Sequence, residues 1–427
     1  MDNQKLREAF LQGDEQETAK IFREMLRGAV RMGLWEAMFA EVESLCGPRY
    51  HPDENSAYKR AGSEKGIAYM NGGKETILRP RVRHQSEGEV KLATYEAASS
   101  PRNLFDEIVA MIGQGLATRG VARVKEGAIS KSEASRMWVE KSREQLEFFR
   151  TRPLDDADWL CLMIDGVHLG GEICVVAAVG IDAEGNKRVL DFEPGPSENI
   201  TVVSDLIERL IKRGIKPHKE RVMLVLRDGS SAIASAVRKH WPDAVQQECL
   251  VHIQRNVREK VRQRDRSDVD AAFKRLREAQ GEAGGQEAWE ELIDFISERN
   301  AAAALNLRER EQAVLAFHRL NVPSTLNTTF LSTNLIENTI RNWREATGNV
   351  KRWNEKEDMV SRWMASGMLW AEAGYRKVRG HQDLGYLLRA LTKRGATRPT
   401  PPQADVSLTT PAVSEYQAKS TLKTTMK

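Results

Sequence analysis

Two aspartates in this sequence each follow an apolar, strand-sized run of residues. Asp165 ends the run CLMID, and Asp228 ends the run VMLVLRD. Two carboxylates that meet at one edge of a sheet repel each other unless a proton or cations compensate. Oxygen ligands of this kind suit Mg²⁺ or Mn²⁺, and a pair of such ions can hold a phosphodiester during in-line displacement. The two aspartates are therefore candidate ligands of divalent cations.

Each aspartate is also followed by glycine, and Asp-Gly is a common turn sequence. Asp165-Gly166 could simply open a hairpin into the next strand and have no chemical role. The apolar run before each aspartate favours the metal site, because active sites on open sheets form where strands end. The residue types alone leave both interpretations open.

A third carboxylate, Glu337, lies in the segment STNLIENTIRNWR. It is the first acidic residue after a long stretch of helical sequence, and it falls on an expected helix that could run beside the sheet edge. Glu337 also follows Asn334 at the spacing of a capping box, so it could merely stabilise the start of that helix. The sequence allows a metal ligand or a cap.

Three smaller features could belong to the same site. Cys249 and His252 have the Cys-x-x-His spacing that can begin a zinc site, but no second pair stands at ligand spacing. His168, three residues beyond the first aspartate, could donate a hydrogen bond within the site or be a histidine on a surface hairpin. Trp343 and Trp353 lie among arginines and could stack on splayed bases at a nicked DNA end, although such tryptophans more often belong to a core.

The segment from 155 to 265 has the pattern of a mixed α/β sheet. Apolar, β-rich runs at 159–164, 172–181 and 188–192 predict three strands that can pair as an antiparallel meander. Helical periodicity then alternates with two further apolar runs, as in parallel crossover connections. This order places the first and fourth strands side by side and suits a ribonuclease H-like mixed sheet.

Helical sequence flanks this pattern on both sides. Residues 266–325 predict a helical insertion in which Gly284-Gly285 separates two helices, and residues 326–392 complete the same domain. Residues 1–66 predict an N-terminal helical region. Residues 393–427 contain few apolar residues and predict a disordered tail.

Residues 67–150 combine a basic extended segment with three helices. Asn71-Gly72-Gly73 marks a turn, and residues 77–82 look extended, with a proline that confines them to an edge or to non-strand structure. Three helical stretches follow with glycines between them, and Ser130 with Glu133 predicts a capping box at the start of the third. This arrangement is compatible with a helix-turn-helix and equally with a plain helical bundle.

Basic residues gather in short runs that could contact nucleic acid. The formal net charge is only +4, so the local distribution matters more than the total. Such runs are usually solvated faces, and they indicate nucleic acid only if the fold brings them to one surface. The candidates for DNA contact are Arg79, Arg81, Arg83, Lys131, Arg136, Lys141, Arg255, Arg341 and Arg344.

The composition is that of a folded globular chain of two or three domains, with 41% hydrophobic and 30% charged residues. No apolar run approaches the ~20 residues that span a bilayer, and the charged start MDNQKLREAF has no signal core. Four scattered cysteines do not form a disulfide framework. We therefore expect a protein of the reducing cytoplasm with no membrane partner.

Four of these segments together resemble the mutator-type family of bacterial insertion-sequence transposases. They are IDGVH at 164–168, LRDG at 226–229, ECLVHIQRN at 248–256 and STNLIEN at 332–338. The similarity covers roughly residues 65–390 and includes GGKETILRPRVR and TRPL. One part departs from the commonest pattern, because RNWREATGNVKRWNEKEDM stands where many members have an arginine-rich stretch with a Phe-Pro element.

The resemblance implies an acidic triad and two-metal chemistry. Asp165, Asp228 and Glu337 would be the catalytic residues and would bind Mg²⁺ or Mn²⁺, as two ions, while Cys249 and His252 would shape the site. The resemblance also implies a ribonuclease H-like catalytic domain with a helical insertion, preceded by a DNA-binding region with a helix-turn-helix. The partners would be the terminal inverted repeats of an insertion sequence and a target DNA, bound by a homo-oligomer associated with the nucleoid.

On this hypothesis the enzyme cuts the ends of the element to leave a 3′-hydroxyl and joins that hydroxyl to target DNA. Two other classes stay open: a metal-dependent nuclease of the same fold, and a DNA-binding regulator that has lost its chemistry. Such a regulator should lack a carboxylate, and all three are present. A glycosidase with two carboxylates would need aromatic sugar platforms, and the strand ends offer only Trp159.

Overall fold

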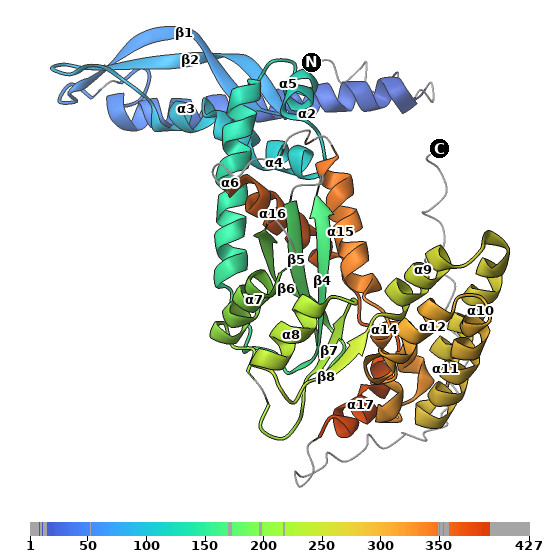
Figure 1. The fold of residues 1–427 in the computed structure, drawn as a ribbon. Coiled ribbons are helices and arrows are strands. Elements are labelled where there is room, and N and C mark those ends of the chain that lie inside the picture. Colours follow the sequence, from blue (N-terminus) through green and yellow to red (C-terminus); the bar gives the residue numbers. More distant parts are fainter. Residues whose placement is uncertain are drawn as a thin grey trace, which may run out of the picture.

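A long helix and a long hairpin form the N-terminal part of the molecule. The computed structural model describes residues 8, 11, 15–51, 53–169, 173–195, 199–216, 218–348, 350, 353 and 358–392. The predicted tail, residues 393–427, lies outside them. The first elements are α2 (Glu15–Cys46), β1 (Tyr58–Met70), β2 (Gly73–His84), β3 (Gly88–Val90) and α3 (Ala93–Ala98). Helix α2 runs along the hairpin and extends beyond it (Figure 1).

The helical prediction for residues 1–66 is wrong beyond the end of α2, because residues 58–66 belong to β1. The sequence YKRAGSEKGIAYM has no clean apolar alternation, and β1 forms through its long pairing with β2. The predicted turn is confirmed: Asn71 and Gly72 have φ of 52° and 75°, as a tight two-residue hairpin turn requires. Pro80 pairs only with β1, since β3 faces Val82 to His84, so the prediction of an edge position is also confirmed.

Three helices with short connections follow the hairpin. They are α4 (Phe105–Gly113), α5 (Thr118–Val124) and α6 (Lys131–Thr151), with the 3-10 turn η1 (Pro101–Leu104) before them. The predicted cap is confirmed, because the Glu133 amide donates to the Ser130 hydroxyl at 3.1 Å. The helices pack around Ile108, Val121 and Trp138, which are buried.

A five-stranded mixed sheet forms the centre of the molecule. Its strands are β4 (Trp159–Leu169), β5 (Ile173–Asp182), β6 (Lys187–Gly195), β7 (Leu224–Arg227) and β8 (Val245–Glu248), in the spatial order β6-β5-β4-β7-β8. Strands β4, β5 and β6 pair antiparallel, while β7 and β8 run parallel to β4. The predicted meander and the predicted neighbourhood of the first and fourth strands are confirmed.

Alternate residues of the sheet enter two separate cores, as the period of a strand requires. Leu162 and Ile164 pack under α7 (Ile200–Lys212) and α8 (Ser231–His240). Cys161 and Met163 face the other side, where the core includes residues of α15 (Asn334–Thr347) and α16 (Met359–Ala373). The sheet is therefore covered on both faces, and only its strand ends are open to a substrate.

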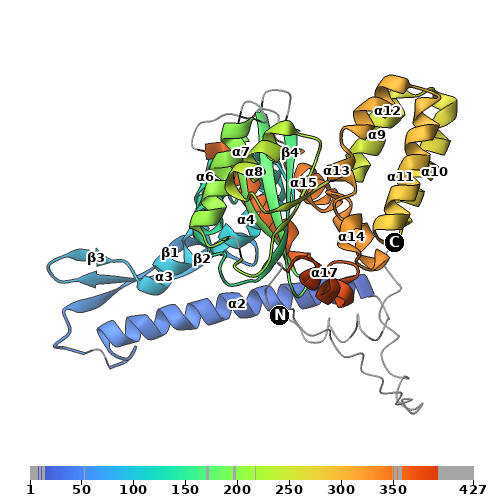
Figure 2. The ribbon, with the colours of Figure 1, turned by 60° about the horizontal axis from the view of Figure 1, so that its bottom comes forward.

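The predicted helical stretch between the two parts of the sheet domain forms a body at one side of the sheet (Figures 1 and 2). Its helices and those around it are α9 (Leu250–Lys260), η2 (Gln263–Asp265), α10 (Arg266–Glu278), α11 (Gly281–Ser297), α12 (Ala301–Arg308), α13 (Glu311–Val314), η3 (His318–Leu320), η4 (Ser324–Leu326), α14 (Asn327–Phe330), η6 (His381–Asp383) and α17 (Leu384–Ala390). The break expected at Gly284-Gly285 is wrong, because both glycines lie inside α11. Gly285 is needed for packing instead: a Cβ there would come within 2.7 Å of the His318 ring.

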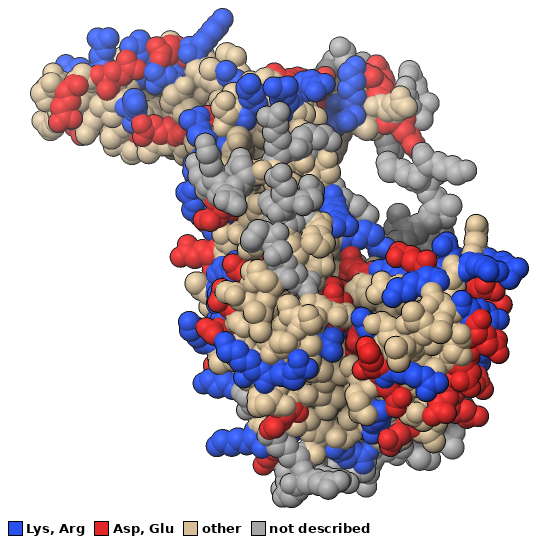
Figure 3. Space-filling model, viewed as in Figure 1, with Lys and Arg blue, Asp and Glu red and all other residues tan. Residues whose placement is uncertain are grey.

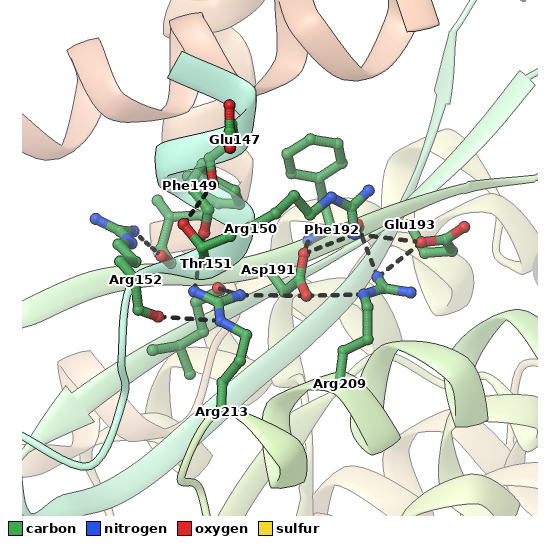
Figure 4. A network of polar contacts seen from close by, with 12 residues as sticks. Glu147, Phe149, Arg150, Thr151, Arg152, Asp191, Phe192, Glu193, Arg209 and Arg213 are labelled. Atoms are coloured by element: carbon green, nitrogen blue, oxygen red, sulfur yellow. Dashed lines mark hydrogen bonds and ion pairs between the residues drawn. The ribbon is translucent and has the colours of Figure 1, made fainter. Parts of the chain in front are cut away.

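A buried ion network fastens α6 to the sheet (Figure 4). The Asp191 carboxylate on β6 is fully buried and lies 3.1 Å from Arg150, 3.0 Å from Arg209 and 3.3 Å from Arg213. Nearby, Arg152 and Glu372 join α6 to α16. These pairs hold the C-terminal end of α6 against the sheet domain.

The described cysteines are all buried. Among the described residues, no helix combines the length and the apolar composition needed to cross a bilayer.

Candidate metal centre

Asp165 and Asp228 occupy equivalent places on neighbouring parallel strands. The last parallel pair of β4 and β7 joins Ile164 to Arg227, and the two aspartates are the next residues. Asp228 follows β7 as predicted, but β4 continues past Asp165, which pairs with Ala177 of β5. Asp165 therefore lies within a strand and not at its end, and the alternative of a hairpin turn there is wrong.

Glu337 reaches the same place from a distant part of the chain. It lies in the first turn of α15, and Asp165, His252 and Glu337 each offer a ligand atom within 4.8 Å of the other two. The Glu337 carboxylate accepts hydrogen bonds from Arg255 at 2.8 and 2.9 Å and lies 3.1 Å from Nε2 of His252. Because both oxygens are turned to α9, the alternative of a capping box is wrong.

Hydrogen bonds fix the starts of α9 and α15 against each other and against β7. The Cys249 amide donates to the Arg227 carbonyl at 2.8 Å, and the Leu250 amide donates to the Leu331 carbonyl at 2.9 Å. The Thr333 amide donates to the Cys249 sulfur at 3.3 Å. The site therefore rests on backbone contacts between segments that are far apart in sequence.

Burial sets the electrostatics of Asp165, whose side chain is 4% exposed. Desolvation raises the pKa of Asp165 to about 7; the positive His252 opposes this rise, and the negative Asp228 and Glu337 reinforce it. Near neutral pH a bound proton or a cation is thus needed to neutralise this carboxylate.

Glu337 and His252 differ from Asp165, because each favours its charged form and the two make an ion pair. Hydrogen bonds from His252 and then from Arg255 lower the pKa of Glu337 to about 2. The pKa of His252 rises to about 11, because the ring lies beside the Cys249 thiol and beside Glu337. Burial alone would raise the pKa of Cys249, but its hydrogen bonds with His252 and Thr333 lower it. His252 and Arg255 thus stabilise the ionised Glu337 carboxylate.

Glu248 is a buried carboxylate near Asp228. The sequence did not predict it. It ends β8 opposite Arg227, is 3% exposed, and its Oε1 accepts a hydrogen bond from Arg310 at 2.5 Å. A Cβ on Gly229 would come within 2.8 Å of Arg310 and 3.0 Å of Glu248. The helical insertion therefore reaches the sheet edge here. The rule that singled out Asp228, a carboxylate at the end of a parallel strand, could also have found Glu248.

The donor set fits a divalent cation. Asp165 and Glu337 offer oxygen atoms of the type that Mg²⁺ and Mn²⁺ prefer, and His252 adds a nitrogen. Asp228 lies outside this close group of three, yet its charge raises the pKa of Asp165. The geometry thus brings Asp165 and Glu337 together with His252, which the sequence had assigned only to shaping the site, and it leaves Asp228 on the neighbouring strand.

The remaining residues predicted to shape the site separate into two sets. Cys249 and His252 lie at the centre, and among the described residues no second Cys or His joins them in a group that could hold zinc. His168 is exposed and lies an odd number of residues beyond Asp165, so its side chain leaves β4 on the opposite face. His168 is therefore a surface histidine, as the second interpretation of the sequence proposed. Its carbonyl accepts a hydrogen bond from Arg344 at 2.9 Å.

The basic candidates near the centre lie on α9 and α15. Arg341 and Arg344 are exposed, and they follow Glu337 by four and seven residues, so they share its helix face. Arg255 is bound to Glu337. A nucleic-acid backbone that passes the carboxylates would meet both exposed arginines.

The basic candidates of the N-terminal part mostly sit in surface ion pairs. Arg79 and Arg81 contact Glu64 and Glu89. The other four candidates are Arg136, paired with Glu133 at 2.8 Å, Lys141, paired with Glu144 at 3.2 Å, and the exposed Arg83 and Lys131. The pairs of Arg136 and Lys141 are exposed and stabilise the fold little, whereas Arg79 and Arg81 are partly buried. Figure 3 shows Lys and Arg gathered over α5, whereas Asp and Glu gather over the outer side of the insertion.

Trp343 belongs to the core, as one of the two interpretations of the sequence proposed, and it is not a platform for stacking bases. Its side chain is buried, stacks on Trp353 with ring centroids 5.4 Å apart, and donates a hydrogen bond to the Trp363 carbonyl. The tight fit explains Gly367, where a Cβ would come within 2.2 Å of the Trp343 ring.

Asp165 gives a prediction for the metal-free protein. The pKa of about 7 lies above the ordinary value of 3.8, so the stability that the protonated form provides is complete below about pH 4 and is lost as pH rises to 7. We expect Asp165→Asn, which carries no charge, to be more stable than the parent at pH 8 by about 4 kcal/mol, with little difference at pH 4. Urea unfolding with a chelator present measures this, and a difference that does not change with pH would contradict it.

Comparisons with known proteins identify the family of this chain. Residues 1–365 match a model of the family described as "Transposase, Mutator family". The chain is 26% identical to the transposase for insertion sequence element IS1201 of Lactobacillus helveticus, over 74% of this chain and 86% of that protein. It is 27% identical to the transposase for IS905 of Lactococcus lactis, over 74% of this chain and 81% of that protein. The chain therefore belongs to the mutator family of transposases.

Proposed function

We propose that the protein is a DNA transposase that binds the terminal inverted repeats of an insertion sequence, cleaves the ends and joins the resulting 3′-hydroxyl to target DNA. The observation that carries this proposal is the close approach of Asp165 and Glu337, from distant segments, with Asp228 at the end of the strand next to Asp165. Carboxylates placed in this way serve metal-dependent phosphodiester chemistry. The names of the relatives support the same class of reaction.

We infer that Asp165, Asp228 and Glu337 hold two Mg²⁺ or Mn²⁺ ions. Such ions, when bound, activate the attacking hydroxyl and stabilise the leaving oxygen. Burial keeps the Asp165 carboxylate in place, and the anchored start of α15 fixes Glu337. Cys249 and His252 shape the site, and the exposed Arg341 and Arg344 would hold DNA phosphates along α15.

For the fold, we propose a ribonuclease H-like sheet in residues 155–265 and 326–392, with residues 266–325 as its insertion. The strand order and the alternation of strands and helices support this assignment. We propose that α4, α5 and α6 form the helix-turn-helix of a DNA-binding region that ends near residue 150. The boundary expected at residue 66 must move into the segment before β1, because the strand crosses it.

A nuclease of the same fold is the second candidate, because its metal site would look alike. Incubation of the full-length protein with labelled terminal-repeat DNA, a plasmid and Mg²⁺ distinguishes the two. A transposase converts label into a plasmid-joined product. Cleaved ends with no joined product would instead assign the protein to the nucleases.

Arg255 provides a test of the metal site that does not depend on activity. Its guanidinium binds Glu337 and repels a cation, so a metal ion must compete with it. We expect Arg255→Gln to bind Mn²⁺ several-fold more tightly than the parent in calorimetry without DNA. Arg258→Gln, three residues along α9 and paired with Asp270, is the matched control and should bind like the parent. Equal affinities in all three proteins would argue that Glu337 does not bind metal.

A further inference from the structure

An ion pair joins the helical insertion to the turn that carries Asp228. Arg310 lies between α12 and α13, and its Nη1 donates a hydrogen bond to Oε1 of Glu248 at 2.5 Å. Glu248 is almost fully buried, so side chains and not solvent must balance its charge. A Cβ on Gly229 would come within 3.0 Å of both Arg310 and Glu248. The pair therefore packs directly on the residue that follows Asp228.

A neutral side chain also fastens the insertion to β8. The amide of the Gln247 side chain donates to the Val314 carbonyl at 2.9 Å and accepts from the Phe317 backbone amide at 2.8 Å. Gln247 is fully buried and lies one residue before Glu248, so these bonds hold the insertion at the same place on the strand. Attachment of the insertion alone therefore does not explain the ion pair of Arg310.

Arg227 is a second arginine beside Glu248, and it holds the backbone of Asp228. Its Nη1 donates to the Asp228 carbonyl at 2.7 Å, and its Nε donates to Oε1 of Gln246 at 3.0 Å. The same Nη1 lies 3.8 Å from Oε2 of Glu248, which is too far for a hydrogen bond. Oδ1 of Asp228 in turn accepts the Ser230 amide at 2.9 Å. Arg227 therefore supports the turn that orients the Asp228 carboxylate.

We propose that Arg310 is a positioning residue for Asp228, because it satisfies the Glu248 carboxylate and so leaves Arg227 on the Asp228 carbonyl. Without Arg310, Oε1 of Glu248 is a buried anionic oxygen that has lost its donor, and such a loss is costly. Among the described residues, Arg227 is the other cation at ion-pair distance from Glu248. A rotation of Arg227 toward Glu248 relieves the buried charge and breaks the bond to the Asp228 carbonyl.

This inference rests on the proposed function, since it gives the helical insertion a role at the proposed metal centre. The first test uses the full-length protein without metal and without DNA. Its outcome therefore decides the role of Arg310 whether or not the protein joins DNA.

Hydrogen exchange at the Ser230 amide measures the order of the Asp228 turn. We expect Arg310→Ala to speed this exchange several-fold, because the amide is bonded to a carboxylate whose backbone is no longer held. The double variant Arg310→Ala/Glu248→Gln should return to the parent rate, since a neutral side chain does not draw Arg227 away. A parent-like rate in Arg310→Ala would overturn the proposal, and so would faster exchange that Glu248→Gln does not reverse.

Arg308→Ala is the matched control. Arg308 lies two residues before Arg310 in the insertion, and it is an exposed arginine that pairs with Asp294 at 4.0 Å. We expect exchange at Ser230 in this variant to equal that of the parent. An equal rise in both arginine variants would mean that loosening of the insertion in general, and not the pairing with Glu248, disturbs the turn.

Calorimetry with Mn²⁺ and no DNA then connects the turn to the metal centre. We expect Arg310→Ala to bind Mn²⁺ several-fold more weakly than the parent, and Arg310→Ala/Glu248→Gln to bind like the parent. Unchanged binding in Arg310→Ala would overturn the role of Arg310 at the centre. Still weaker binding in the double variant would also overturn it, because Glu248 would then be a metal ligand itself. A parent that binds no Mn²⁺ would instead contradict the proposed metal centre, and exchange at Ser230 would still test the action of Arg310 on the turn.

Discussion

Asp165→Asn and Asp228→Asn should each lower the rate of DNA cleavage and of joining by about 10³-fold or more, and the double variant should be hardly worse than either single one. The two aspartates follow the same parallel pair of β4 and β7, and the charge of Asp228 acts directly on Asp165. Residues that hold one metal centre act as a unit, so the first loss removes most of the function. Rates of plasmid-joined product in Mg²⁺ measure the effect.

Binding of the terminal repeats is the control for both variants. The proposed DNA-binding helices α4–α6 lie in another part of the chain, so gel-shift affinities should stay within a few-fold of the parent. Multiplicative losses in the double variant would mean that the aspartates act independently, which a shared metal centre does not allow.

Asp191→Ala should destabilise the protein by about 3–5 kcal/mol, because it leaves Arg150, Arg209 and Arg213 facing a cavity with no anion. Asp191 is fully buried, and its Oδ1 also accepts the Phe192 amide at 2.8 Å. Urea unfolding followed by tryptophan fluorescence measures the change. The effect should appear in the sheet domain and in α6 together, since the network joins them (Figure 4).

Asp156→Ala is the matched control for the buried network. Asp156 also pairs with an arginine, Arg188, at 2.7 Å, but its side chain is half exposed. A surface pair of this kind contributes about 0–1 kcal/mol. Similar losses in the two variants would show that burial of Asp191 has no special role.

The order of elements in the sheet domain could be predicted because each strand is an apolar run and each crossover has helical periodicity. The order of the strands then brings Asp165 and Asp228 together, so half of the site follows from local pattern. Strand β1 could not be predicted in this way, because its polar residues form a strand only through pairing with β2. The predicted helix break at Gly285 was wrong for a related reason. This glycine allows close packing against His318 and does not end a helix.

The other half of the site depends on contacts between segments far apart in sequence. Glu337 reaches the sheet edge because the start of α15 is bonded to Cys249 and Leu250 at the start of α9. No local sequence pattern predicts that contact. The spacing between Asn334 and Glu337 was equally compatible with a capping box. The pairing of Arg255 with Glu337 was hidden for the same reason, although both residues were singled out separately.

Glu337→Gln tests the central claim most directly, because Gln keeps the size of the side chain and removes the charge that would hold an ion. The measurement is the rate at which labelled terminal-repeat DNA is joined to a plasmid in Mg²⁺, with repeat binding measured in parallel. We expect joining to fall by about 10³-fold or more while repeat binding is unchanged. Joining at near the parent rate would mean that Glu337 is no metal ligand, and the assignment of Asp165, Asp228 and Glu337 as one metal centre would be wrong.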